Sequence, residues 1–99
     1  MVDRATKYID EHYDEIQTVQ DVAAALKCPY HSLRKAFAQE IGMPMQNYLH
    51  RVRVRAAKVL MKKSTLKLYA IARQVGYSSD NSLRRHWKKF YGRCPGRRS

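Results

Sequence analysis

The sequence contains one pattern of residues twice, about 50 positions apart. Moving residues 22–26 forward by 49 positions and residues 31–42 by 50 places apolar residues on apolar residues and glycine on glycine. The matched pairs are Val22 with Ile71, Ala23 with Ala72, Leu26 with Val75, Leu33 with Leu83, Phe37 with Trp87 and Gly42 with Gly92. In each copy the spacing is helical and predicts a short helix, a tight turn and a longer helix. The repetition therefore indicates an all-α fold with two helix-turn-helix units.

Further helices are predicted before and between the two copies. Apolar residues with helical spacing predict a first helix over residues 3–14, followed by a short helix that opens at Thr18. Asp21, three residues after Thr18, resembles the acid of a capping box. The longer helices of the two copies are expected to begin near residues 30 and 80, and Gly42 is expected to end the first of them in a left-handed conformation.

Residues 45–63 predict a long helix that is apolar on two sides. One face combines Met45, Tyr48, Leu49, Val52, Ala56, Val59 and Leu60, and the other combines Val54, Ala57 and Met61. A helix that is apolar on two sides must be covered on two sides. We therefore expect a linker helix (residues 44–63) between a first helix-turn-helix subdomain (1–43) and a second (64–99), with about seven helices in all. Its outer stripe of Arg51, Arg55, Lys58 and Lys62 is expected to meet solvent or phosphate.

The charge of the chain is concentrated after its first quarter. Residues 1–25 hold two basic residues against six acids, whereas residues 26–99 hold eighteen against two. Such a surface repels itself unless it binds a polyanion, so nucleic acid is the first candidate partner and an anionic membrane the second. The acidic first helix is expected to face away from such a partner, where it could offer a surface to another protein.

The last predicted helix separates its aromatic residues from its charges. Leu83, Trp87, Phe90 and Tyr91 fall on one face, and Asn81, Arg84, Arg85, Lys88 and Lys89 fall on the other. A membrane-binding helix would expose the apolar face to lipid, and an RNA-binding surface would favour outward aromatic residues. The separation favours insertion of the basic face into a DNA groove, with the membrane and RNA alternatives left open. Tyr30 and Tyr77 are not decided by the pattern.

The chain shows no sign of catalysis or of a cofactor. Ninety-nine residues are too few to enclose an active-site cavity, and the four histidines have no nucleophile or carboxylate at a recognisable spacing. Cys28 and His31 have a spacing found in zinc sites, but no second ligand pair follows. We expect no metal, no cofactor and no enzyme. The two cysteines and the absence of a long apolar run predict a cytoplasmic protein with reduced thiols.

Two segments, "IGMPMQNYLHRVRVRAAKVLM" and "AIARQVGYSSDNSLRRHWKKFYGRCP", resemble the DNA-binding domain of the AraC/XylS family of bacterial transcription regulators. The resemblance covers nearly the whole chain. It implies binding to double-stranded promoter DNA in the bacterial nucleoid, and often contact with RNA polymerase in activation. Family members commonly carry a separate effector-binding or dimerisation domain, and no part of this sequence resembles one.

The resemblance also implies which residues contact bases. They are Tyr30, His31, Arg34 and Lys35 in the first recognition helix and Asp80, Asn81, Arg84 and Arg85 in the second. From residue chemistry alone, Arg84 and Arg85 suit guanine, whereas Lys88 and Lys89, on later turns, suit phosphate or solvent. Asp80 either accepts a hydrogen bond from a cytosine amino group or only stabilises the helix N-terminus.

Several positions differ from the family pattern. Pro29 and Pro44 stand where an N-cap serine is common, and Lys67 stands at the position that matches Thr18. Lys27 replaces a turn glycine and is expected at positive φ. Cys94 replaces the serine of the Gly-x-Ser-Pro motif. These differences predict weaker helix capping within an unchanged fold.

Overall fold

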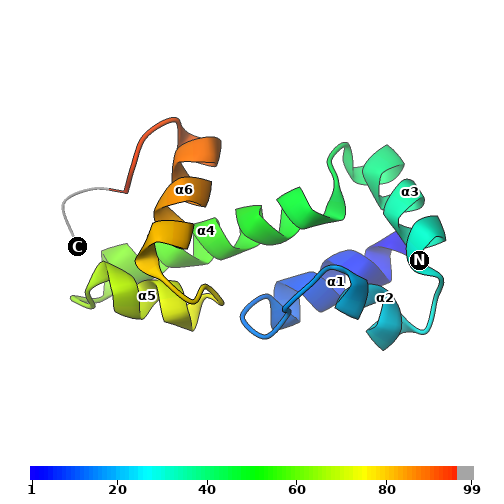
Figure 1. Ribbon diagram of the computed structural model, residues 1–99, viewed down its shortest axis with the longest axis horizontal. Helices are drawn as coiled ribbons and strands as arrows, with labels where there is room; N and C mark the ends of the chain where they lie inside the picture. Colours follow the sequence, from blue (N-terminus) through cyan, green and yellow to red (C-terminus); the bar gives the residue numbers. More distant parts are fainter. Residues whose placement is uncertain (96–99) are drawn as a thin grey trace. The chain divides into compact units, whose positions relative to one another are not determined.

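The computed structural model describes residues 1–95 and contains six α-helices in that part of the chain (Figure 1). Their bounds are α1 Val2–His12, α2 Gln20–Leu26, α3 Tyr30–Ile41, α4 Met45–Lys63, α5 Leu68–Gln74 and α6 Asp80–Tyr91. The all-α prediction is confirmed, and the described residues show six helices against the expectation of about seven. Among them, no helix is long and apolar enough to cross a membrane.

The chain divides into two compact units, and the division falls inside α4. Unit 1 is Met1–Val52 and unit 2 begins at Arg53. Each unit contains one complete copy of the repeat, α2 with α3 or α5 with α6. The expected subdomain limits at residues 43 and 63 remain a prediction.

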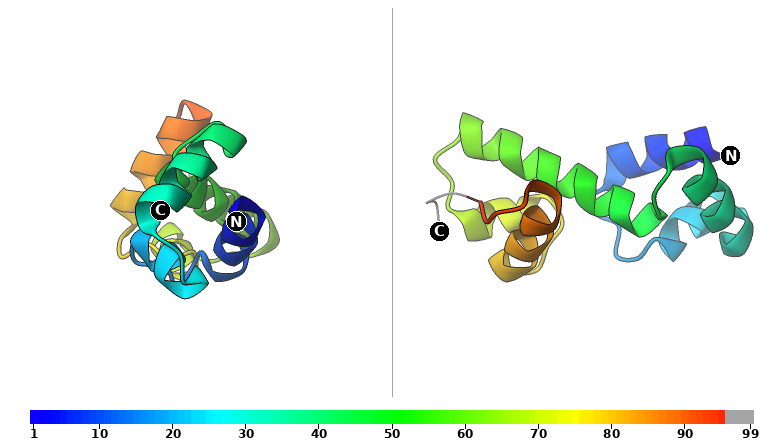
Figure 2. Two further views of the ribbon diagram at one scale, coloured as in Figure 1. Left: turned by 90° about the vertical axis from the view of Figure 1, so that its right-hand side faces the viewer. Right: turned by 90° about the horizontal axis from the view of Figure 1, so that it is seen from above.

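Unit 1 is built around one apolar core that all of its helices share. α1 contacts α2 and α3, and α2 contacts α3 (Figure 2). The first turns of α4 supply Met45 and Leu49 to the same core. The Phe37 ring meets the Tyr48 ring edge-on at 5.4 Å, and the Tyr48 hydroxyl donates to Asp10 Oδ1 at 2.9 Å. α4 is therefore tied to both α1 and α3. The other buried core residues of the unit are Val2, Ala5, Ile9, Ile16, Val22, Ala23 and Leu33.

The residues at the ends of α2 and α3 shape the turn between these two helices. The Thr18 N–H donates to Asp21 Oδ2 at 3.2 Å, which is the acid half of the expected capping box. The helix does not open at Thr18 as expected, because α2 begins at Gln20 with Val19 at the N-cap position and no side-chain cap. Lys27 ends α2 in the left-handed region with φ 57°, as predicted, and Gly42 ends α3 at φ 86°. Pro29 precedes α3 without a side-chain cap.

Unit 2 repeats the arrangement with α5 and α6, which pack together. Its buried hydrophobic residues are Val54, Ala57, Leu68, Ile71, Ala72, Val75, Tyr77, Leu83 and Trp87. The Ser79 side chain caps α6 by accepting from the Ser82 N–H at 3.3 Å, and Gly92 ends the helix at φ 78°. Lys67 precedes α5 and provides no side-chain cap, as the sequence predicted.

Two of the residues expected to face inward lie at the surface instead. Val59 is 48% exposed and Tyr91 is 38% exposed. Val59 lies roughly opposite Val54 around α4, and the core of unit 1, which covers that face, ends near Val52. Conversely, Arg53 is only 6% exposed, although no pattern in the sequence predicts its burial.

Candidate nucleic-acid interface

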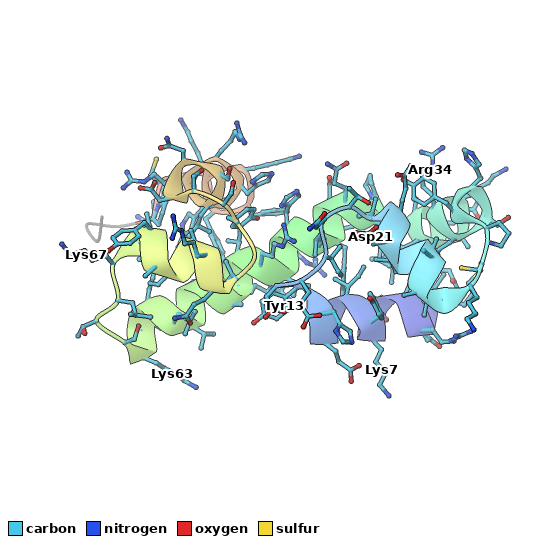
Figure 3. The ribbon with its side chains drawn as sticks, turned by 60° about the horizontal axis from the view of Figure 1, so that its bottom comes forward. Lys7, Tyr13, Asp21, Arg34, Lys63 and Lys67 are labelled. Carbon is cyan, nitrogen blue, oxygen red and sulfur yellow. The ribbon has the colours of Figure 1, made fainter. Side chains whose placement is uncertain are left out.

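The outer face of α3 presents three of the four residues predicted for it. His31, Arg34 and Lys35 are exposed, and they line a shallow groove together with Ala38, Gln39 and Pro44. Figure 3 shows Arg34 projecting from one side of unit 1 and Lys7, on α1, from the opposite side. Tyr30 is half-buried, with its ring centroid 5.9 Å from that of His31. A ligand at the α3 face therefore meets two cations and an imidazole.

The outer face of α6 is more strongly basic. Asn81, Arg85, Lys88 and Lys89 are exposed, while Arg84 and Asp80 are half-exposed. Arg84 Nη2 lies 3.5 Å from Asp80 Oδ2, one turn away along the helix. Arg84 Nε is buried and has no hydrogen-bond partner within residues 1–95. An exposed pair of this kind contributes little to stability, but it holds Arg84 near the first turn of α6.

Trp87 anchors α6 to its unit. Trp87 is 8% exposed, and its ring packs 5.0 Å from that of Tyr91, centroid to centroid. Tyr77, which the sequence left undecided, is 6% exposed. Trp87 and Tyr77 therefore belong to the core and are not available to stack on nucleobases.

The sequence did not predict a cluster around His86. His86 Nδ1 donates to the Ser82 carbonyl at 2.8 Å, and its ring stacks on Tyr77 at 5.3 Å with 15° between the planes. The buried Arg53 guanidinium lies 5.3 Å from the Tyr77 centroid. The Ser82–His86 spacing of four residues was the one signal available in the sequence.

Burial and neighbouring charge act on the pKa values in this cluster. Burial lowers the pKa of His86 below 6.5, the Ser82 carbonyl opposes this, and the cations Arg85, Lys89 and Arg53 lower it further. Burial raises the pKa of Tyr77 far above its ordinary value, and Arg53 partly opposes the rise. Both shifts favour the uncharged form of the side chain.

The two units carry very different charges. Residues 1–52 hold six Lys and Arg against seven Asp and Glu, a net charge of −1, whereas residues 53–99 hold fourteen against one, a net charge of +13. The basic outer face of α6 thus lies in a unit that is itself a strong polycation.

Within residues 1–95, no group of three or more His, Cys, Asp or Glu side chains is arranged to hold a metal ion.

Comparisons with known proteins agree with this geometry. A family model described as a helix-turn-helix domain matches residues 22–98. An uncharacterized HTH-type transcriptional regulator of Bacillus subtilis is 30% identical over 91 residues, covering 92% of this chain and 32% of its own length. The lactose operon transcription activator of Staphylococcus xylosus is 30% identical over 91 residues, covering 91% of this chain and 32% of its own length. The chain thus spans about a third of the length of these relatives.

Solved structures show the same fold. The C-terminal domain of AraT, a response regulator from Geobacillus stearothermophilus, matches with a TM-score of 0.88 and 29% identity over 95% of this chain and 78% of that one. The DNA-binding domain of AdpA, solved in complex with a target DNA, has the same fold, with a TM-score of 0.87 and 23% identity over 95% of this chain and 85% of that one.

Two helix-turn-helix units, each with outward cations on its second helix, define a DNA-binding module of transcription regulation. The chain belongs to the AraC/XylS family of helix-turn-helix transcription regulators.

Proposed function

We propose that the chain reads two successive major-groove segments of one promoter duplex, with α3 in one segment and α6 in the other. The duplicated helix pair with matched outer residues carries this proposal: His31, Arg34 and Lys35 correspond to Asn81, Arg84 and Arg85. α4 has 19 residues and a length of about 28 Å at 1.5 Å per residue. That length is compatible with the ~34 Å between successive major-groove segments on one side of DNA.

The residue types assign the contacts. Arg34, Arg84 and Arg85 have the planar donors that pair bidentately with guanine, and the Asn81 amide matches adenine. Tyr30, His31 and Lys35 complete the α3 contacts, with Tyr30 limited by its partial burial. Lys88 and Lys89 bind phosphate. Asp80 acts mainly by holding Arg84, since the two side chains are already paired.

The charge distribution indicates that the two units contribute differently to affinity and to specificity. Phosphate neutralisation supplies much of the affinity of a DNA-binding protein, and base contacts supply its specificity. Unit 2, with a net charge of +13, provides most of the affinity, and unit 1, with −1, adds mainly base recognition.

Membership of the family also supports a regulatory role. We infer a regulator of the bacterial nucleoid, without catalytic function in this chain, that works together with a separate effector-binding or dimerisation domain. Relatives named as transcription activators, such as that of the lactose operon, support a role in activation, and contact with RNA polymerase is part of our proposal. The exposed acids of α1, Glu11 among them, offer a surface for such a contact.

The alternatives are less well supported. An interfacial membrane helix needs an exposed apolar face, whereas Leu83 is fully buried and Trp87 is 8% exposed. Base stacking in RNA recognition needs outward aromatic rings. Tyr77 and Trp87 are buried, and the exposed rings of unit 2 are Tyr69 on α5 and Tyr91 at the end of α6.

Replacement of Arg84 by alanine tests base reading. We expect Arg84→Ala to weaken binding to a selected cognate duplex by about 1–3 kcal/mol, and binding to a scrambled duplex by much less. Fluorescence anisotropy at fixed salt measures both affinities. The matched control is Lys63→Ala, because Lys63 projects from the side of unit 2 opposite to α6 (Figure 3). Equal losses on cognate and scrambled DNA would remove Arg84 from the base-reading set.

A further inference from the structure

A concave site beside the carboxyl end of α6 is not part of the predicted base-reading face. It is lined by Lys58, Trp87, Tyr91, Arg93 and Cys94, all within unit 2. Lys58 reaches the site from α4, and its Nζ lies 4.8 Å from the centroid of the Tyr91 ring. Two cations therefore border a floor of two aromatic rings, with the exposed Cys94 thiol at the edge.

The chemistry of the site suits a monoanion with an apolar portion. Lys58 and Arg93 supply charge and N–H donors, the thiol is a weak donor, and the rings offer an apolar surface. The carboxyl end of a helix carries partial negative charge, which repels anions. An anion there depends on Lys58 and Arg93, and neither has a carboxylate partner among the ion pairs of residues 1–95.

The position of the site beside α6 favours the DNA backbone as the source of the anion. Trp87 follows Arg84 by three residues, and Tyr91 follows Lys88 by three, so the site adjoins the flank of the basic face. A helix with its side chains is about 10–12 Å across, and the major groove is about 12 Å wide. The flanks of an inserted helix therefore lie against the phosphate backbones that border the groove.

We infer that this site, defined by Lys58, Arg93 and the ring of Tyr91, binds one backbone phosphate and its adjoining sugar in the duplex that α6 enters. The inference rests on the proposed function and deepens it. The phosphate lies between the Lys58 ammonium and the Arg93 guanidinium, and the sugar packs on Tyr91. We call this site of Lys58, Arg93 and Tyr91 the clamp. It fixes the depth and register of α6 in the groove and does not contact the bases.

The salt dependence of binding tests the clamp. Lys58→Gln and Arg93→Gln should each flatten the slope of log affinity against log salt by about 0.9, because each removes one phosphate contact. Cognate and scrambled duplexes should lose affinity by the same factor, in contrast to Arg84→Ala. Lys58→Arg should retain the slope of the parent protein. The matched control is Lys63→Gln, a loss of the same charge from α4 on the side of unit 2 away from α6 (Figure 3).

An unchanged slope in Lys58→Gln, or a slope change equal to that of Lys63→Gln, would overturn the clamp while leaving the proposed function intact. A parent protein that binds no duplex would instead overturn the proposed function, and the clamp with it.

Cys94 provides a second readout at the same site. In a Cys28→Ser background Cys94 is the only thiol, and its alkylation by neutral iodoacetamide can be followed by mass spectrometry. Saturating duplex should slow the reaction, and inorganic phosphate at the same phosphate concentration should not. Alkylation at the free rate in the duplex complex would contradict the clamp. Equal protection by inorganic phosphate would assign the site to a free anion and overturn its assignment to the DNA backbone.

Discussion

At the scale of single residues, His86 is expected to make the stability of the folded protein depend on pH. Its ring is held by the Ser82 carbonyl and by stacking on Tyr77, close to the cations Arg85 and Lys89. Burial and these cations keep the pKa of His86 below 6.5 in the folded protein. The folded state therefore favours the neutral ring, and the unfolded chain binds a proton more readily.

The expected consequence is a loss of stability in mild acid. As pH falls below 6.5, the unfolded chain takes up a proton at this position before the folded protein does, so the free energy of unfolding decreases until the lower folded pKa is reached. His86→Phe retains an aromatic ring and removes the titration, so its stability should fall less between about pH 7.5 and pH 5. Urea denaturation at several pH values measures the difference. Parallel pH profiles for the parent protein and the variant would contradict the depressed pKa.

Lys27 shows what a family pattern can predict at a single position. The pattern commonly has a turn glycine there, which predicted a positive φ for Lys27, and the structure has 57°. Arg53 shows the opposite, because nothing in its neighbours indicates that it is 6% exposed over the Tyr77 ring. The conformation of such a turn follows from the helix pair that it joins, which the resemblance identifies, whereas burial of a charge depends on residues far along the chain.

At the scale of helices, the two helices of unit 2 differ in how their first turns are capped. Ser79 caps α6 through the Ser82 N–H, while Lys67 precedes α5 with extended geometry, φ −72° and ψ 157°, and no side-chain cap. The backbone of Lys67 already has the conformation of an N-cap. The uncapped start of α5 is thus a local weakness of unit 2.

Substitutions at these two N-cap positions should change the stability of the protein in opposite directions. Lys67→Ser is expected to raise the free energy of unfolding, and Ser79→Ala to lower it, each by about 1 kcal/mol. Urea denaturation at neutral pH measures both. A Lys67→Ser variant no more stable than the parent would show that the start of α5 gains nothing from a cap. Lys67→Ala, which removes the same charge without adding a cap, is the control.

The long helix shows both the reach and the limit of helical periodicity. Its bounds and its two apolar faces were predicted, and Met45, Leu49, Val54 and Ala57 are all buried. Periodicity could not show that the first face is only partly covered beyond Val52, where unit 1 ends, so that Val59 is 48% exposed. The end of a covered face is set by the size of the partner core, and a helical wheel contains no information on that size.

At the scale of the whole molecule, duplication was the most informative signal in the sequence. It identified both helix pairs, the glycines that end α3 and α6, and the outward position of Arg34, Lys35, Asn81 and Arg85. The site was less completely predictable. The Asp80–Arg84 pair, the His86 cluster and the Lys58–Tyr91 contact all depend on side-chain packing around α6.

The most direct test of recognition by two helices is site selection from a random duplex library with the parent protein, Arg34→Ala and Arg84→Ala. The parent should select a site with two informative segments, about one helical turn of DNA apart. Arg34→Ala should lose information in one segment only, and Arg84→Ala in the other only. A single informative segment, or loss at the same base pairs in both variants, would contradict the proposal that α3 and α6 read separate major-groove segments.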